Sequence, residues 1–515
     1  MMLRLGIDVG GTNTDAVLVD GAGAVLAAHK APTTADPLDG ISAAIQAVSR
    51  GADLSRIRQA MLGTTHSANA IIQRLGLGRV AVLRLAAPSS LAVSPGADWP
   101  DDLRDSVITE VAITEGGYEY DGRVIADLDE EAIRRFTTEA QKAGTVAVSC
   151  AFSPANFEHE LRAAEILAEE LGEDFPISLS HRVGTLGLLE RENATILNAA
   201  LQGVAKAVVD GLDNALASHG IDAASYITQN DGTLMTSAHA LAMPVLSLAS
   251  GPTNSMRGAC SLAGLADAIV VDVGGTSTDI GILVDGFPRE SAAAVYVGGV
   301  RTNFRMPDLI SMGLGGGTIV RPDVTGVTVG PDSVGYRVTS DALVSGGSTL
   351  TLSDISVAGG RLQDFGDASA VDDLDPATVD RALSWVDEQL AAHCERMKAS
   401  RRPMPLLAVG GGAHLVSERV SGASEVIRPR HYEVANAFGA AISEASGTVD
   451  RVYQYGSSSR EECLEAARAE ALASAVEAGA DPDQTRITSV VEVPMTYVPG
   501  GGCRVQVKAA GPLGG

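Results

Sequence analysis

The stretch Leu5-Gly-Ile-Asp8-Val-Gly10-Gly11-Thr12-Asn13-Thr14-Asp15 returns later in the chain as Val270-Val-Asp272-Val-Gly274-Gly275-Thr276-Ser277-Thr278-Asp279. The two copies of DVGGT(N/S)TD differ at one position. In each copy apolar runs of strand length flank paired glycines, which predicts a strand, a tight turn and a second strand. Paired glycines also let backbone N–H groups approach an anion closely. The repeat therefore predicts two phosphate-binding turns, and two unrelated glycine hairpins are the alternative.

Each copy carries a carboxylate at the end of its first strand, Asp8 in one and Asp272 in the other. A carboxylate at that place would repel a phosphate. A cation such as Mg2+ between the two groups removes the repulsion, so both carboxylates are expected to face a metal ion. The threonines of the two turns are expected to add hydroxyl donors, and they are Thr12, Thr14, Thr276 and Thr278.

Size and composition set limits on the class of protein. A chain of 515 residues predicts two or three domains. No apolar run approaches the ~18 residues of a membrane span, and the first residues lack the pattern of a secretory signal, so we expect a cytoplasmic protein without a membrane segment. The formal charge of −26 disfavours binding to nucleic acid or anionic membranes. It does not exclude ATP, because local backbone donors and a metal can hold a nucleotide.

The rest of the chain alternates strand-like and helical runs. Residues 78–180 predict an α/β arrangement by this alternation. Residues 431–441 predict a helix with small residues on one face, able to pack closely on another helix. The tail, residues 510–515, is expected to fray.

Two further glycine-rich stretches are candidates for contact with a ligand. Residues 405–415 read as strand, glycine turn and helix, and Gly410, Gly411 and Gly412 would let a flat adenine or ribose lie against the backbone. A dinucleotide fingerprint is ruled out there because GxGxxG opening an amino-terminal βαβ unit is absent. The glycine triplet at 315–317 favours proximity to a ligand, with a plain tight turn as the alternative.

Three polar segments are candidates for contacts that recognise a substrate. Residues 64–69 form the start of a predicted helix, where free N–H groups suit an anion or a carbonyl, although ordinary capping explains them equally well. His66 in that turn is a catalytic candidate or a capping histidine. Residues 190–198 fit a hinge or substrate contact as well as a solvated helix start, and residues 229–232 form a polar turn after a strand.

The order of these landmarks resembles the actin/Hsp70/sugar-kinase ATPase superfamily. Five stretches together resemble, more narrowly, the hydantoinase A/oxoprolinase family over nearly the whole chain: residues 63–70, 190–199, 250–252, 272–279 and 409–414. The resemblance implies an α/β fold of two ribonuclease-H-like lobes with a nucleotide cleft between them. We expect an amino-terminal lobe at 1–185, a second lobe at 186–450, and a helix with strands at 451–515 that pack on the lobes.

The resemblance also implies roles for single residues. Asp8 and Asp272 would hold Mg2+ through waters. Asp15 and Asp279 would either bond the amides of their own turns or position the nucleophile. The groups around ATP would be the two phosphate turns, Gly10, Gly11, Thr12, Asn13, Thr14 and Gly274, Gly275, Thr276, Ser277, Thr278, and the adenosine glycines Gly410, Gly411 and Gly412.

The activity implied is that of an ATP-dependent amidohydrolase A subunit of the hydantoinase, oxoprolinase or lactamase type. ATP would phosphorylate the oxygen of a cyclic amide and so prepare the ring for opening. The alternatives are an ATP-dependent ketone carboxylase subunit, a small-molecule kinase, and an ATP-driven reactivase or chaperone-like switch. The family implies a B-type partner subunit, and assembly with further copies of the chain stays open.

Overall fold

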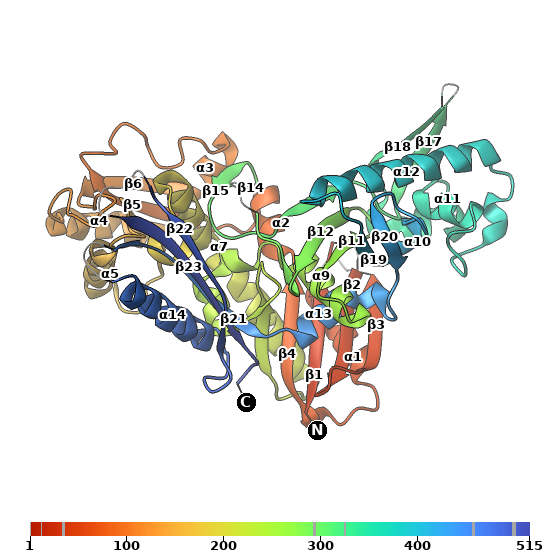
Figure 1. The fold of residues 1–515 in the computed structure, drawn as a ribbon, viewed down its shortest axis with the longest axis horizontal. Coiled ribbons are helices and arrows are strands. Elements are labelled where there is room, and N and C mark those ends of the chain that lie inside the picture. The colour runs from red at the N-terminus through yellow and green to blue at the C-terminus, as the bar shows by residue number, and fades with distance from the viewer. Residues whose placement is uncertain are drawn as a thin grey trace.

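The computed structural model describes residues 2–11, 13–32, 37–291, 295–323, 326–455, 459–496 and 501–514. Within these ranges the chain is a mixed α/β fold with sheets of nine, six and four strands and two two-stranded ribbons. Figure 1 shows strands of the four-stranded sheet at the left end of the molecule and strands of the six-stranded sheet to the right of its centre. Of the helices described, none combines the length and the apolar character that crossing a lipid bilayer requires.

The nine-stranded sheet, called the long sheet here, has the order β22-β23-β21-β10-β9-β4-β1-β2-β3. Its strands are β1 Leu3–Val9, β2 Asn13–Asp20, β3 Val25–Pro32, β4 Ile57–Thr64, β9 Ala224–Thr228, β10 Leu234–Thr236, β21 Ala445–Gln454, β22 Arg486–Pro494 and β23 Gly502–Gly511. Strands from all three predicted units, 1–185, 186–450 and 451–515, pair in this one sheet. The division of the chain into these units therefore stays a prediction. The expected fraying of the tail is wrong for its described part, because β23 runs to Gly511 and Leu513 is buried against Ala480.

The six-stranded sheet, called the short sheet, has the order β13-β12-β11-β19-β20, with β16 paired to β12. Its strands are β11 Ala268–Val273, β12 Thr278–Val284, β13 Phe287–Pro288, β16 Leu309–Met312, β19 Met404–Val409 and β20 Ala423–Ile427. Beside it lie the ribbon strands and helices β17 Thr318–Asp323, β18 Gly326–Ser333, α10 Val338–Asp341, α11 Leu352–Ala358 and α12 Pro376–Met397.

The two sequence repeats form the same unit in the two sheets. β1 and β2 are antiparallel with Asp8 opposite Asp15, and β11 and β12 are antiparallel with Asp272 opposite Asp279. In each sheet the first strand of the hairpin also pairs in parallel with a later strand, β4 in one and β19 in the other. The predicted strand, turn and strand are therefore confirmed for both copies.

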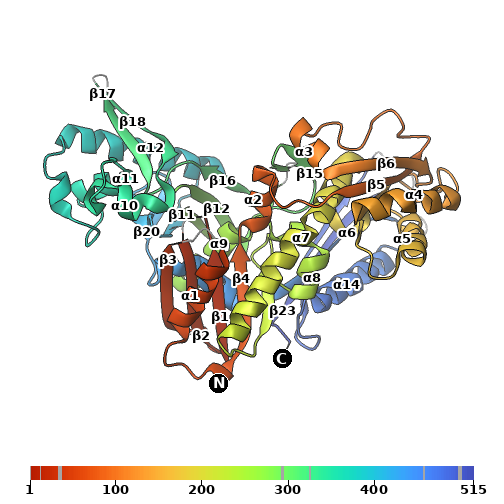
Figure 2. The same cartoon turned by 180° about the vertical axis from the view of Figure 1, so that it is seen from behind.

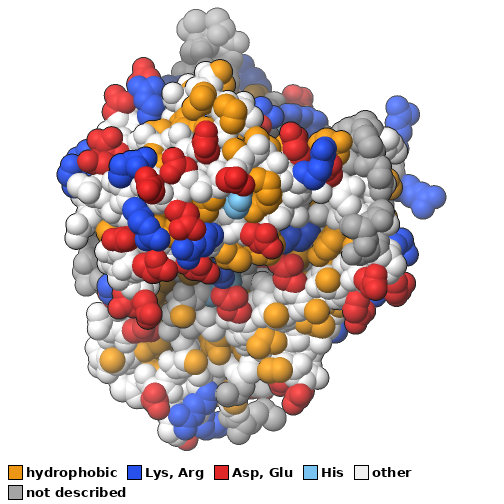
Figure 3. Space-filling model, turned by 90° about the vertical axis from the view of Figure 1, so that its left-hand side faces the viewer, with side chains coloured by type: hydrophobic (Ala, Val, Ile, Leu, Met, Phe, Trp, Pro, Cys, Tyr) orange, Lys and Arg blue, Asp and Glu red, His pale blue; other side chains and the backbone are white. Residues whose placement is uncertain are grey.

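The four-stranded sheet, called the outer sheet, is parallel throughout and has the order β6-β5-β7-β8. Its strands and neighbouring helices are β5 Val80–Ala87, β6 Ile108–Glu115, β7 Val146–Cys150, β8 Ile177–Leu179, α3 Asp101–Val107, α4 Glu130–Ala143, α5 Glu158–Leu171 and α6 Ser180–Val183. This arrangement confirms the α/β prediction for residues 78–180. Acidic and basic side chains alternate closely on this end of the molecule (Figure 3), and Arg162 with Glu130 is one ion pair there.

Long helix α7, Leu188–Ser218, runs diagonally across the back of the molecule and contacts both the outer sheet and the helix beside β1 (Figure 2). The remaining elements are α1 Pro37–Ser49, α2 His66–Gln73, α8 Ser237–Ala242, α14 Arg460–Glu477 and the ribbon β14 Val295–Val297 with β15 Val300–Thr302. α14 packs on β21 and β23 of the long sheet.

Helices α9, Ser250–Ala263, and α13, Ala435–Ile442, cross each other between the long and short sheets. The crossing is very close: a Cβ atom on Gly258 would lie 1.9 Å from the Ala435 carbonyl oxygen, and one on Gly439 would lie 1.9 Å from that of Asn254. The predicted close-packing helix is confirmed, although it starts at Ala435 after a 3-10 turn at Tyr432–Val434. The amino-terminal ends of both helices reach the space between the two hairpin turns.

Candidate functional site

The two hairpin turns face each other across a cavity of about 160 Å3, called the first cavity here. The glycine turn after β19 and the starts of α9 and α13 close its sides. Of the residues expected at this site, those on its wall are Asp8, Gly10, Gly11, Asn13, Asp15, Asp272, Gly274, Gly275, Thr276, Ser277, Asp279, Gly410 and Gly411. The fold therefore brings three stretches that are far apart in the sequence to one place.

Some expected residues lie elsewhere. Thr14 and Thr278 are fully buried beneath their hairpins, because alternate side chains of a strand point to opposite faces. The Thr278 hydroxyl donates to the Leu314 carbonyl at 2.6 Å and so supports the fold of the turn. Gly412 lies behind the cavity wall, where its N–H donates to the Val273 carbonyl at 2.7 Å. Thr12 lies outside the described residues.

His66 is also away from the first cavity. Its Nδ1 lies 2.8 Å from the Thr64 hydroxyl, and the ring is half-buried at the start of α2. Its neighbour Thr65 lines the cavity instead. Thr65 is the N-cap residue of α2 but makes no side-chain cap hydrogen bond, and the Ser67 hydroxyl lies 3.0 Å from that of Ser247, so ordinary capping does not account for this segment and the catalytic role of His66 stays a prediction.

Asp8 lies at the centre of the site and is 3% exposed. Asn436 donates to its Oδ2 at 3.0 Å and Asn254 to its Oδ1 at 3.4 Å. Burial, with a smaller contribution from the charge of Asp15, raises the pKa of Asp8 to about 7. The two amide hydrogen bonds act in the opposite direction and are outweighed.

Asp15 has an ion pair that the sequence did not indicate. Lys30 from β3 places its Nζ 2.8 Å from Asp15 Oδ1 and 2.9 Å from the Glu433 carbonyl oxygen. Asn436 donates to Asp15 Oδ2 at 2.8 Å, so one amide bridges Asp15 and Asp8. Burial still raises the pKa of Asp15, while Lys30 lowers it.

The second hairpin is arranged in the same way, except that no lysine among the described residues forms an ion pair with Asp279. Burial raises the pKa of Asp272, with the Ser255 hydroxyl acting in the opposite direction. Burial also raises the pKa of Asp279 to about 6, although Ser311 donates a hydrogen bond to this carboxylate. Gly410 has φ +84°, and a Cβ atom there would come within 2.3 Å of Asp272 Oδ1. Glycine at this position therefore lets the third turn approach the carboxylate.

The walls fit a phosphate chain with a magnesium ion. A Cβ atom on Gly11 would meet no atom within 4 Å, and one on Gly411 only the Lys30 Cε at 3.4 Å, so both backbone faces are open to a ligand. Among the described wall residues Lys30 is the basic one, against several acidic groups; burial is the main cause of the raised carboxyl pKa values, and the neighbouring carboxylates add to it. A cation would relieve it.

The described residues contain no group of three or more His, Cys, Asp or Glu side chains placed to hold a metal ion. Mg2+ is commonly held by one or two carboxylates, with waters and phosphate oxygens completing the shell. Asp8 and Asp272 suit that manner of binding.

The glycine triplet at 315–317 supports the second turn instead of lining the cavity. Gly316 and Gly317 donate to the carbonyls of Gly274 and Gly275 at 3.0 and 2.8 Å. A Cβ atom on Gly315 would lie 2.6 Å from the Gly275 carbonyl carbon. The tight-turn interpretation therefore accounts for this triplet.

Sequence reasoning missed several polar residues of the site, among them Lys30, Asn254, Ser255 and Asn436. Asn436 had a visible signal, because it is a polar residue inside an otherwise apolar small-residue helix. Lys30 lies on a strand with alternating exposure and had no such signal.

Residues 4–171 match the hydantoinase/oxoprolinase N-terminal region, and residues 191–397 match the hydantoinase/oxoprolinase family. The caprolactamase subunit alpha of Pseudomonas jessenii is 28% identical over 458 residues, which cover 80% of this chain and 62% of that subunit. The acetophenone carboxylase gamma subunit of Aromatoleum aromaticum is 29% identical over 395 residues, which cover 69% of this chain and 53% of that subunit. The chain thus matches only part of the length of these relatives.

The crystal structure of the ATP-dependent caprolactamase from Pseudomonas jessenii has the same fold. It superimposes with a TM-score of 0.78 at 21% identity and covers 99% of this chain and 88% of that chain. The α/β fold expected from the sequence is confirmed over nearly the whole chain. At this level of identity the likeness concerns the fold alone.

Proposed function

Because the chain belongs to the hydantoinase/oxoprolinase family, we propose that it binds ATP with Mg2+ in the first cavity and phosphorylates the carbonyl oxygen of a small cyclic amide. The observation that carries the proposal is the meeting of both glycine turns, with Asp8 and Asp272, on one cavity. Two anion-binding turns and two carboxylates suit a triphosphate and its metal ion better than any single-charged ligand.

The residues of the site would act mainly by position and charge. Backbone N–H groups of the two glycine turns would bind phosphate oxygens, and Lys30 would offset part of the negative charge. Asp8 and Asp272 would hold Mg2+, which supplies charge neutralisation for phosphoryl transfer. Asn436 would keep the carboxylates of Asp8 and Asp15 in place.

The choice of a cyclic amide follows from chemistry and from the relatives. An amide resists hydrolysis by water at neutral pH. Transfer of the γ-phosphoryl group to its oxygen leaves ADP and a carbon with a good leaving group, which water attacks readily. The caprolactamase subunit alpha is among the most similar relatives.

A second candidate is ATP-dependent carboxylation of a ketone, and the similarity to the acetophenone carboxylase gamma subunit supports it. The same phosphoryl transfer would activate an enol oxygen or bicarbonate. Both relatives are named as subunits, so we also propose that this chain works with a B-type partner subunit.

ATP turnover by the purified chain separates the candidates. Lactams, hydantoins, and ketones with bicarbonate are added in turn, with and without a co-purified partner. Stimulation of phosphate release by a cyclic amide supports the first candidate, and stimulation by a ketone with bicarbonate supports the second. ATP turnover that responds only to another protein and to no small molecule would contradict both candidates and favour an ATP-driven switch.

A further inference from the structure

A second cavity, of about 320 Å3, lies between the outer sheet, the long sheet and α14. Its walls come from segments that are far apart in the sequence, and they include residues 181–185, 229–231, 304–307 and 446–451 together with residues of α8 and α14 and the stretch 288–290. Among the described residues it shares no wall residue with the first cavity. A volume of about 300 Å3 or more suits a small organic ligand.

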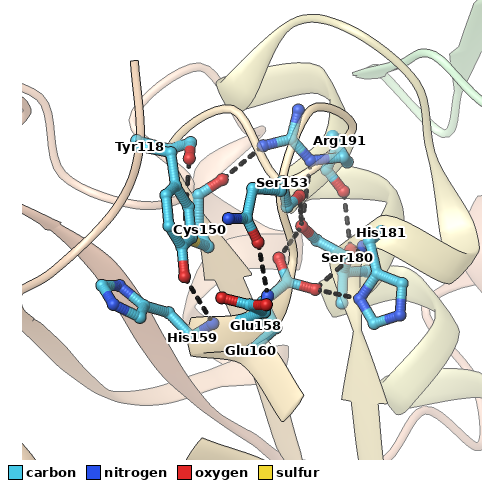
Figure 4. Close-up of polar contacts among 12 residues, drawn as sticks. Tyr118, Cys150, Ser153, Glu158, His159, Glu160, Ser180, His181 and Arg191 are labelled. Carbon is cyan, nitrogen blue, oxygen red and sulfur yellow. Dashed lines mark hydrogen bonds and ion pairs between the residues drawn. The ribbon is translucent and has the colours of Figure 1, made fainter. Parts of the chain in front are cut away.

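His181 on the wall of the second cavity is held by a buried carboxylate. Its Nδ1 lies 2.6 Å from Glu160 Oε2, and its backbone N–H donates to the same oxygen at 2.9 Å (Figure 4). Glu160 is 0% exposed and also accepts from the Ser180 hydroxyl. Burial alone would raise the pKa of Glu160, but the hydrogen bond from His181 and the charge of Arg191 hold it below its usual value. Glu160 is therefore a carboxylate.

The carboxylate decides which ring nitrogen of His181 carries the proton. Because the carboxylate can only accept, Nδ1 is the nitrogen that donates to it, and Nε2 is left to face the cavity; in the tautomer with the proton on Nδ1, Nε2 carries a free lone pair. In Figure 4 the second ring nitrogen points away from Glu160. The described part of the structure shows no hydrogen bond to Nε2, and this nitrogen is not enclosed by protein either, since it is absent from the buried unsatisfied atoms.

The ring is locked in place on its other sides. It stacks on Phe157 with ring centres 4.5 Å apart and planes inclined by 11°. The Arg451 guanidinium lies 4.8 Å from the Phe157 ring centre and donates to the His181 carbonyl at 3.0 Å. This histidine is thus oriented as a rigid acceptor toward the cavity.

The remaining wall combines apolar side chains, uncharged polar ones such as Thr185, Asn230 and His239, and charged groups that pair within the protein. Apolar side chains are contributed by Met243, Leu246, Phe304 and Met306. The wall charges are paired within the protein: Arg182 with Glu477 at 2.9 Å, Arg305 with Glu290 at 3.3 Å, and Asp231 with Lys508 at 2.6 Å. The cavity therefore offers no surplus charge and suits a neutral ligand.

Both cavities have wall residues at the carboxyl ends of central strands of the long sheet, Asp8 near the end of β1 for the first and Gln229 directly after β9 for the second. Asp8, Gly63 and Thr228 lie in a row across β1, β4 and β9, so Asp8 and Thr228 are separated by two strand spacings, about 10 Å. The Asn254 amide donates to both Asp8 at 3.4 Å and the Thr228 hydroxyl at 3.1 Å. Gln229, the next residue after Thr228, is on the wall of the second cavity.

We propose that the second cavity is a separate binding site for a small neutral amide, whose N–H group donates a hydrogen bond to Nε2 of His181. The neutral walls select against charged ligands, and the fixed lone pair selects for a donor. The site goes beyond the phosphoryl transfer proposed above, because binding here needs no nucleotide. Only the choice of a lactam as probe rests on that function.

Calorimetric titration of the full chain with ε-caprolactam, without nucleotide, tests the proposal. We expect saturable binding by the wild type and at least tenfold weaker binding of N-methylcaprolactam, which lacks the N–H donor. His181→Gln keeps a donor toward Glu160 but removes the ring acceptor, and it should weaken caprolactam binding at least tenfold. Thr448→Trp, which fills the cavity from β21, should do the same.

His219→Gln is the matched control, because this histidine contacts Ser42 and is not on the cavity wall. It should bind caprolactam as the wild type does. Circular dichroism and thermal melting verify that each variant is folded. If His181→Gln is misfolded, the binding of caprolactam by Thr448→Trp and the binding of N-methylcaprolactam by the wild type test the proposal instead.

Three results would overturn the proposal. They are no saturable binding of caprolactam by the wild type, equal binding by wild type and Thr448→Trp, or competitive displacement of caprolactam by a non-hydrolysable ATP analogue. If any of these results is found while caprolactam still stimulates ATP turnover, the second site is refuted and the proposed function stands.

Discussion

Asp8 combines burial, a raised pKa and two amide partners in a way that no other expected site residue does. Its carboxylate must be charged to hold a cation, yet in the metal-free protein burial favours the protonated form. A group in this state binds a cation only by giving up a proton. The proposed binding of Mg2+ at Asp8 would therefore be coupled to proton release at this residue.

Asp8→Asn and Asp272→Asn should each lower Mg2+-dependent ATP turnover by at least a hundredfold while leaving the fold intact. The amide has the shape of the carboxyl group but lacks the charge that holds the metal ion. Turnover is measured as phosphate release, with circular dichroism to verify folding. Asp210→Asn, at an exposed position on α7, is the control. Near-normal turnover in both variants would show that the metal ion lies elsewhere.

Binding of Mg2+ should strengthen as the pH rises through about 7, with release of a proton from Asp8. The sign follows from the raised pKa: below it the carboxyl is protonated, and above it the carboxylate is free for the cation. In the metal-free protein the same shift lowers stability as the pH rises from 3.8 to about 7, because the folded state binds the proton more tightly than the unfolded state.

Calorimetry in two buffers of different ionisation enthalpy measures the proton released per Mg2+ bound. Asp8→Asn should abolish this buffer dependence. Proton release that is the same in Asp8→Asn and wild type would contradict the assignment.

At the scale of single residues, strand alternation explains the difference between the expected and observed sites. Asp15 faces the cavity, while Thr14, one position earlier, is fully buried. The motif alone predicted that the hydroxyl groups of Thr14 and Thr278 donate to the ligand. The alternation of side chains along the strands turns both hydroxyl groups away from the cavity. Lys30 reaches Asp15 only because β3 pairs with β2, with Lys30 directly opposite Asp15.

At the scale of elements, the crossing of α9 and α13 holds the two sheets in register around the first cavity. Gly258 and Gly439 let the helix backbones touch. Asn254 and Asn436, which bond Asp8, come from these same two helices. Packing of the crossing therefore also fixes the positions of the amides in the site.

Gly258→Ala and Gly439→Ala should each destabilise the protein by at least about 2 kcal/mol, because overpacking of a close contact forces backbone shifts. Gly203→Ala on α7 is the matched control: its Cβ atom would meet nothing within 4 Å, and alanine in an exposed helix gains about 0.5–1 kcal/mol. The free energy of unfolding is measured by urea titration. Equal changes in the free energy of unfolding at all three glycines would show that the close approach of α9 and α13 does not contribute to stability.

At the scale of the whole molecule, the end of the chain ties the sheets together. Lys508 on β23 is 8% exposed and pairs with Asp231 at 2.6 Å. Its Nζ also lies 4.5 Å from the ring centre of Phe287, which belongs to the short sheet. One side chain of the long sheet thus contacts both a distant loop and the opposite sheet.

Asp231→Asn should cost about 3–5 kcal/mol near neutral pH, because it leaves a buried charge on Lys508 without its partner. Burial alone would raise the pKa of Asp231, but the charge and hydrogen bond of Lys508 hold it below its usual value. The ion pair therefore stabilises the protein above pH 3.8, and this contribution is lost as the pH falls further.

The measurement is the free energy of unfolding at neutral and acidic pH. The exposed pair of Lys206 with Asp210 is the control, and Asp210→Asn should change stability by about 0.5 kcal/mol or less. A loss for Asp231→Asn no larger than this would contradict the role of the buried pair.

The sequence by itself determined the two hairpins, because paired glycines between apolar runs leave the local chain few other conformations. It also determined the helix pattern and, through the ordered motifs, the family. Only the tertiary structure decided which residues share a cavity, because Asp8, Asp272 and Asn436 meet through strand pairing and a helix crossing between segments hundreds of residues apart. The same holds for Glu160 and His181, whose contact depends on how α5 packs beside the end of β8, a long-range arrangement that local patterns do not encode.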